Sequence, residues 1–232
     1  MRYRNPIFFI AVLIFTALFF LQQNRANAQV LNEANKKRIS IAFGMFTDIW
    51  LKVPAEMKTR AINQGVNVFA TYNIPFGKSN FGFSVGLGIR IQNLYWNYMY
   101  QGNSPDSFQF VKISDTLGYK RSKLTMPYLE LPIEFRFKTK YKFAVSLGFK
   151  LSYMVYGHTK FVGDDYLYKT SNTLRVAFKG IENIERFAYG PTLRIGYKWF
   201  HVNAYYSLSR IFTKEKGPEM VPISVGFTLM PF

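Results

Sequence analysis

The chain has 232 residues, a formal net charge of +17 and no cysteine, so a disulfide framework and a thiolate metal site are both excluded. Aromatic residues are abundant, with 24 Phe and 16 Tyr, but the mean hydropathy is near zero. This combination does not fit a helical membrane protein, whereas it fits strands in which apolar and polar residues alternate.

Residues 1–28 are predicted to be a cleavable signal peptide. A positive start at Arg2 precedes an apolar run over residues 7–21, and small residues lead to a cleavage site after Ala28. A membrane anchor is the less favoured alternative, because a run of 15 residues is shorter than the roughly 20 that a spanning helix needs. The polar residues 29–38 then form a short periplasmic lead-in.

Period-two alternation predicts three strands in the next part of the chain. The strands cover residues 39–51, 61–74 and 81–94, because side chains that alternate between two faces are typical of a strand. A loop over residues 52–60 and a tight turn over residues 75–80 separate them.

The clearest alternation lies in residues 124–156. One side of the first half is apolar, whereas the other side carries Glu130, Glu134 and Arg136. A polar break at residues 138–140 predicts the turn of a long antiparallel hairpin. Both strands exceed the length of about 5–6 residues that is usual in soluble sheets, and they suit a tilted bilayer crossing of about 9–11 residues.

Three further strands complete the pattern, over residues 186–198, over residues 201–212 and from Val221 to the end of the chain. The connections after the even-numbered strands are short, and two of the others, residues 95–123 and 157–185, are long and polar. Short turns at one end and long loops at the other are typical of outer-membrane barrels. The prediction is therefore an all-β, eight-stranded antiparallel up-and-down transmembrane barrel over residues 39–232, in the outer membrane of a Gram-negative bacterium.

The polar side of the strands is predicted to fill the barrel lumen. It is rich in small residues, which suits the interior of an eight-stranded barrel, and it carries charges of both signs that would be costly unless paired. Counting outward from the hairpin turn places Arg136 opposite Lys142. The predicted structural network contains Arg90, Glu130, Glu134, Arg136, Lys142, Lys150, Arg186 and Arg194.

Aromatic residues near the strand ends are predicted to form two girdles at the membrane interfaces, where a ring with one polar edge is favoured. The girdle toward the long loops contains Trp50, Tyr95 and Trp96, and the girdle toward the short turns contains Tyr141, Trp199 and Phe200.

Several segments resemble one known family. PYLELPIEFRFKT, KFAVSLGFKLSY, RFAYGPTLRIGYKWF and PISVGFTLMPF are similar to segments of the PorT-like outer-membrane β-barrel proteins of Bacteroidetes. The resemblance covers nearly all of the mature chain and implies an outer-membrane location. It also implies a link to type IX secretion, in which the namesake of the family takes part, and it brings no catalytic residue.

The leading functional hypothesis is a non-enzymatic protein with a structural or interaction role in the cell envelope. A lipid-modifying enzyme is an alternative, but it needs a histidine beside a serine and an acid, and neither His158 nor His201 has such a partner at a suitable spacing. A narrow solute channel is a second alternative, although an eight-stranded barrel has little free width inside it. No catalytic residue, cofactor or metal is predicted, because the aspartates of the long loops do not match an EF-hand.

The positive charge points to the membrane surface as the partner. Lysines and arginines are spread over the strands, turns and loops without one clustered face, which disfavours nucleic acid. Outer-membrane lipid and lipopolysaccharide are the expected partners, with an envelope or secretion-machinery protein as a further one. The cations expected to meet lipopolysaccharide phosphates are Lys52, Lys58, Arg60, Lys112, Lys120, Arg121 and Lys123.

Overall fold

The computed structural model describes residues 38–102, 108–165 and 172–231. The predicted signal peptide therefore lies outside the described residues, as does most of the lead-in. Within the described ranges, no helix combines the length and the apolar character that crossing a membrane requires.

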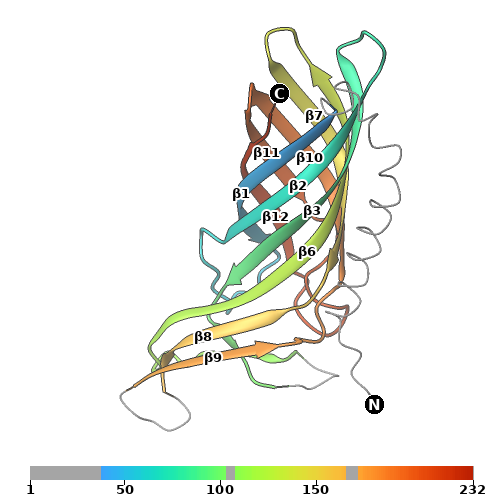
Figure 1. The fold of residues 1–232 in the computed structure, drawn as a ribbon. Coiled ribbons are helices and arrows are strands. Elements are labelled where there is room, and N and C mark those ends of the chain that lie inside the picture. The colour runs from blue at the N-terminus through green and yellow to red at the C-terminus, as the bar shows by residue number, and fades with distance from the viewer. Residues whose placement is uncertain (1–37, 103–107, 166–171, 232) are drawn as a thin grey trace, which may run out of the picture. The chain divides into compact units, whose positions relative to one another are not determined.

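Eight strands close into an antiparallel barrel (Figure 1). Each strand pairs with the next barrel strand along the chain, and β12 pairs back with β1 to close the sheet. This is the predicted up-and-down order. The barrel strands are β1 (Ile39–Leu51), β2 (Gln64–Pro75), β3 (Phe81–Tyr95), β6 (Tyr119–Lys138), β7 (Phe143–Met154), β10 (Phe187–Tyr197), β11 (Phe200–Tyr206) and β12 (Val221–Leu229).

The apolar side of the strands faces outward, as predicted. Leu87 is 70% exposed and Leu147 is 62% exposed, whereas Ser84 and Ser146 on the opposite parity are buried. A protein in water would bury the large apolar side chains and expose the serines. The inverted pattern requires hydrocarbon around the barrel.

The turn between β6 and β7 is wider than predicted. Arg136 lies opposite Ser146 rather than opposite Lys142. The Thr139 amide donates a hydrogen bond to the Phe143 carbonyl at 2.8 Å, and Lys142 adopts a positive φ of 65°. Residues 139–142 therefore form the turn, and Lys142 lies outside the paired strands.

Strand β11 is shorter than predicted and ends at Tyr206, although the Ser207 and Leu208 amides still donate to the Pro222 and Tyr189 carbonyls at 3.1 and 2.8 Å. The Ser207 hydroxyl donates to the Ser209 carbonyl at 3.0 Å, and such local bonds compete with strand pairing. The chain then turns inward, where Ile211 and Phe212 are buried.

The described parts of the two long loops contain four short strands that were not predicted from the sequence. Strand β4 (Tyr98–Tyr100) pairs with β5 (Phe110–Lys112). Strand β8 (His158–Asp164) pairs with the beginning of β6, and β9 (Thr173–Lys179) pairs with β8. Residues 119–125 of β6, together with β8 and β9, form a three-stranded sheet that we call the extension. It projects beyond the end of the barrel that is opposite the short turns (Figure 1).

The predicted aromatic girdles differ in how well the exposure of their side chains fits the prediction. Tyr141, Trp199 and Phe200 are exposed at the short-turn end, as an interfacial girdle requires. Trp50 and Trp96 were assigned to the opposite girdle, but both are buried inside the barrel, at 8% and 3% exposure. That assignment is wrong, since Trp50 shares the inward parity of its strand.

Candidate functional site

Six of the eight predicted lumen charges are buried inside the barrel, and two are not. Lys142 lies exposed in the β6–β7 turn, and Arg186 lies exposed just before β10. The Arg186 guanidinium donates to the Tyr153 hydroxyl at 3.4 Å. Both residues lie outside the paired strands, where alternation no longer determines the face. The buried charges are Arg90, Glu130, Glu134, Arg136, Lys150 and Arg194.

Glu130 is the centre of one buried cluster. Its carboxylate lies 3.3 Å from the Lys150 ammonium and 3.7 Å from Nε of Arg90. The Asn67 side-chain amide donates to its other oxygen at 3.2 Å. A carboxylate that lies between two cations offsets part of the desolvation cost of all three groups.

Glu134 is the centre of the second cluster, nearer the short turns. The Arg194 guanidinium donates to its carboxylate at 2.7 Å. Arg136, two residues further along β6, donates to the side-chain oxygen of Asn73. The two clusters are four residues apart on one strand, so together they fill successive levels of the lumen.

Aromatic rings line the same interior and contact the cations. The Arg90 guanidinium lies 4.8 Å from the Tyr128 ring centre and 5.2 Å from that of Tyr205. The Lys150 ammonium lies 3.9 Å from the Tyr205 ring. Such contacts stabilise a desolvated cation by about 2 kcal/mol. Neither ring is among the predicted lumen residues, although both tyrosines lie on the inward parity of their strands and are buried.

Asp48 is a further lumen acid that the sequence analysis missed. It is fully buried and accepts a hydrogen bond from the Ser224 hydroxyl at 2.5 Å. Its inward parity, shared with Gly44, could have revealed it. With Asp48 included, three buried acids face four buried cations, so the charges of the described lumen nearly balance.

The two clusters line one small cavity. This cavity of about 30 Å³ lies between Glu130, Glu134, Arg194 and Asn203. A buried water needs at least about 10–15 Å³ of such space, so the cavity accommodates about two waters. It is too small for a nutrient-sized solute.

An aromatic cluster fills the barrel at the long-loop end. The Trp96 ring lies 4.8 Å from the Phe110 ring and is stacked at 6.1 Å on the Phe212 ring. Phe108 contacts Phe212 edge-on at 5.2 Å. These rings come from the end of β3, from the β4–β5 hairpin and from the inward turn after β11, so three separate segments contribute to the cluster.

Neither histidine has the surroundings of a catalytic base. His201 is buried, and His158 stacks on the Tyr156 ring at 5.7 Å. Partial burial, with Lys123 and Lys179 nearby, lowers the pKa of His158, whereas a triad acid would raise it. In the described part of the chain, no group of three or more His, Asp or Glu side chains could hold a metal ion.

Four of the seven predicted loop cations lie outside the extension, and three lie within it. Lys52 pairs with Glu219 at 3.9 Å, and Lys112 pairs with Asp115 at 3.9 Å. The Arg60 guanidinium lies over the Tyr95 ring at 4.8 Å, and Lys58 is exposed. The other three, Lys120, Arg121 and Lys123, lie in the extension, where β8 and β9 bring further cations beside them.

Comparisons with known proteins agree with the observed architecture. A family model described as an outer membrane protein beta-barrel domain matches residues 15–213. None of the curated proteins matches the chain.

Several solved structures are similar to this chain at low identity. Ail, the attachment invasion locus protein of Yersinia pestis, in complex with the heparin analogue sucrose octasulfate, is 15% identical over 83% of this chain and 97% of its own, with a TM-score of 0.37. Ail in a phospholipid bilayer nanodisc is 13% identical over the same shares, with a TM-score of 0.34. A triple mutant of the Rhodopseudomonas blastica porin is 9% identical over 83% of this chain and 99% of its own, with a TM-score of 0.22.

Proposed function

Because this chain belongs to the family of outer membrane protein β-barrel domains, we propose that it is a non-enzymatic envelope protein whose barrel anchors an external interaction surface. Its location is the outer membrane, where the apolar outer face of the eight strands meets hydrocarbon. The filled lumen is the observation that carries the proposal. A barrel with a filled lumen suits a protein that anchors other parts of itself in the membrane.

The lumen is filled at several levels along the barrel. The Glu130 and Glu134 clusters occupy the interior, and the aromatic cluster around Trp96 occupies the long-loop end. The cavity beside the ion clusters, of about 30 Å³, favours an anchoring role over the role of a solute channel.

The extension supports the interaction role. It consists of paired strands rather than irregular loop, and β9 is paired on one side only, by β8, among the described strands. It belongs to the long-loop end of the barrel, which faces the exterior in outer-membrane barrels. A partner therefore meets an ordered surface.

Planar-bilayer recordings test the filled barrel. The purified chain, folded and inserted into a bilayer, is expected to give no stable single-channel steps. Its insertion is verified by protection of the barrel from protease. Reproducible steps from the inserted protein would overturn the anchoring role in favour of a channel.

A link to protein secretion is a narrower proposal, supported by the resemblance to PorT-like proteins. Deletion of the gene in its natural host is expected to reduce export of secreted proteins, and expression of the whole chain is expected to restore it. If export is unchanged after deletion, the secretion link is wrong, while the envelope role does not depend on it.

A further inference from the structure

The strands of the extension bring six cations to one surface. Directly opposed residues of an antiparallel pair place their side chains on the same face. Lys123 lies opposite Lys160, and Val162 lies opposite both Arg121 and Arg175. We call this surface the cationic face, and it contains Lys120, Arg121, Lys123, Lys160, Arg175 and Lys179.

The cationic face continues the lipid-facing surface of the barrel. Arg121 and Lys123 share the parity of Leu129, whose side chain is exposed on the outer face of β6. The opposite face of the extension is apolar, and its Phe178 ring lies 5.1 Å from the Tyr100 ring of β4. The apolar face therefore packs on the β4–β5 hairpin, which leaves the cations toward the outside.

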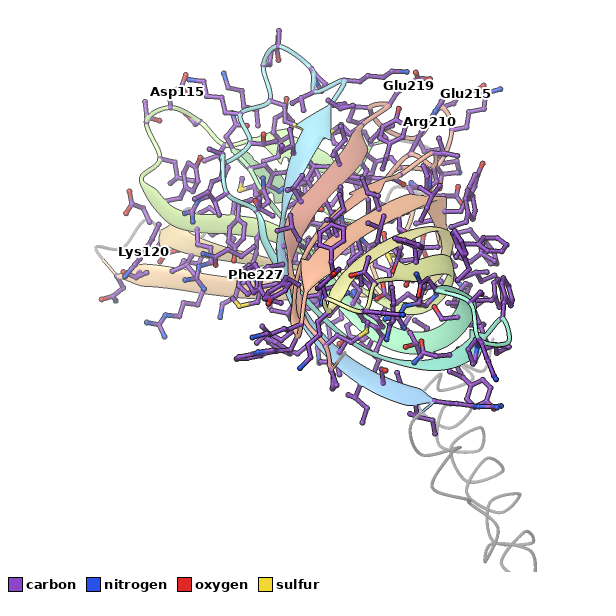
Figure 2. The ribbon with its side chains drawn as sticks, turned by 90° about the horizontal axis from the view of Figure 1, so that it is seen from above. Asp115, Lys120, Arg210, Glu215, Glu219 and Phe227 are labelled. Carbon is purple, nitrogen blue, oxygen red and sulfur yellow. The ribbon has the colours of Figure 1, made fainter. Side chains whose placement is uncertain are left out.

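A hollow of about 230 Å³ lies on this face, lined by Lys120, Arg121, Lys160 and Arg175. It exceeds the roughly 150 Å³ cavity that admits benzene in another protein, so a phosphate group fits. Figure 2 shows Lys120 on the part of the extension that projects away from the barrel.

The cations of the hollow form no ion pairs within the described part of the protein, and Asp164, which shares the parity of Lys160 on β8, accepts a hydrogen bond from the Gly118 amide at 2.8 Å. None of the four cationic side chains of the hollow lies within ion-pair distance of a described carboxylate. The Arg60 guanidinium adds positive charge nearby, since it donates to the Lys120 carbonyl at 3.2 Å. Burial, followed by repulsion from Arg121 and Lys160, lowers the pKa of Lys123. Several unpaired cations held close together favour an anion that accepts several hydrogen bonds.

We propose that this hollow binds the phosphate groups of the outer-leaflet glycolipid, lipopolysaccharide. The inference rests on the proposed envelope role, in which the extension lies outside the membrane. Two arginines supply planar, bidentate donors and two lysines supply point charges, which is the donor set that phosphate recognition uses. Because the face begins where the apolar belt of β6 ends, its cations lie at the level of lipid headgroups rather than of hydrocarbon.

Native mass spectrometry of the folded full chain in detergent tests this site. The probes are bisphosphorylated lipid A, dephosphorylated lipid A and inorganic phosphate. Wild type is expected to bind the phosphorylated form at least about tenfold more tightly than the dephosphorylated form, since several basic residues contribute at an anionic surface. The variant K120Q/R121Q/K160Q/R175Q is expected to lose this preference.

Four exposed lysines of the short turns provide the matched control. K78Q/K140Q/K142Q/K198Q removes the same number of positive charges at the opposite end of the barrel, and the preference is expected to survive. If the fourfold extension variant does not fold, R121Q/R175Q is measured instead, with a partial loss expected. Conductance of the same preparation tests the filled barrel separately, because a conducting barrel would leave the lipid preference unaffected.

Three results would overturn the inference. Wild type could bind both lipid A forms equally, or the extension variant could keep the preference. Inorganic phosphate could also bind to the hollow as tightly as lipid A, which would assign the site to a free anion.

Discussion

Neutralising Glu130 is the most informative single change in the lumen. The substitution Glu130→Gln keeps the size of the side chain, so it creates no cavity, but it removes the negative charge between Lys150 and Arg90. Those two cations lie 3.3 Å and 3.7 Å from the carboxylate, and all three groups are buried. After the change, two buried cations lose their nearest counter-charge.

The expected cost follows from that burial. Breaking a buried ion pair by removing one partner costs about 3–5 kcal/mol, because an uncompensated charge remains in a low-dielectric interior. A difference of 1.4 kcal/mol is a factor of ten in the folding equilibrium, so the ratio of folded to unfolded barrel is expected to fall more than about a hundredfold.

Glu219 supplies the control for this prediction. Its carboxylate also contacts two cations, Arg210 at 2.5 Å and Lys52 at 3.9 Å, but its side chain is 51% exposed. Figure 2 shows Arg210 and Glu219 close together at the periphery of the molecule. Glu219→Gln is expected to cost less than about 1 kcal/mol, because solvent screens exposed pairs.

Urea unfolding of each variant from lipid vesicles, followed by tryptophan fluorescence, measures both changes on one scale. The double variant Glu130→Gln with Lys150→Met is expected to regain part of the lost folding free energy, since it removes one of the two cations left without a counter-charge. The reasoning is refuted if Glu130→Gln costs no more than Glu219→Gln.

Three further predictions test other parts of the molecule. Leu147→Lys on the lipid face is expected to destabilise the membrane-inserted barrel by about 2–4 kcal/mol, whereas Tyr141→Lys at the turn costs about 0–1 kcal/mol; equal values in urea unfolding would contradict the lipid-facing assignment. Trp96→Ala is expected to cost about 3–5 kcal/mol by leaving a cavity, but planar-bilayer recordings should still show no channel, because the ion clusters remain; single-channel steps would show that the aromatic cluster alone closes the barrel. The lowered pKa of His158 means that the unfolded state binds the proton more readily, so the extension should become easier to cleave with protease as pH falls below about 6.5; cleavage of His158→Gln should lack this dependence, and an identical pH profile would refute it.

The barrel itself could be predicted from the sequence because alternation is a local signal. Each strand shows its own two faces, and eight such segments with loops sorted by length leave few other arrangements. The bounds of β1 agree with the prediction at both ends. Parity also predicts that Trp50 is buried, whereas its position near the end of the strand predicts an interfacial ring, and the structure follows the parity.

The parts that could not be predicted depend on distant pairing or on backbone conformation. The pairing of Arg136 with Ser146 depends on a turn in which Lys142 takes a positive φ, and this is an uncommon conformation for a residue other than glycine. Strands β8 and β9 form because the beginning of β6, more than thirty residues earlier, offers an edge. The seven-residue sequences of β8 and β9 taken alone resemble polar loops. The cationic face, which needs their pairing with β6, could therefore not be predicted from the sequence.

Strand β6 runs over 20 residues, with one register shift between Tyr119 and Arg121, from the short turn before β7 to the outer part of the extension. One continuous strand therefore belongs both to the barrel wall and to the outer sheet. The distance of Arg121 and Lys123 from the bilayer is then set by the length of a paired strand rather than by the changing conformation of a loop. A headgroup would meet donors whose conformational freedom was already lost during folding, so little further ordering would weaken the association.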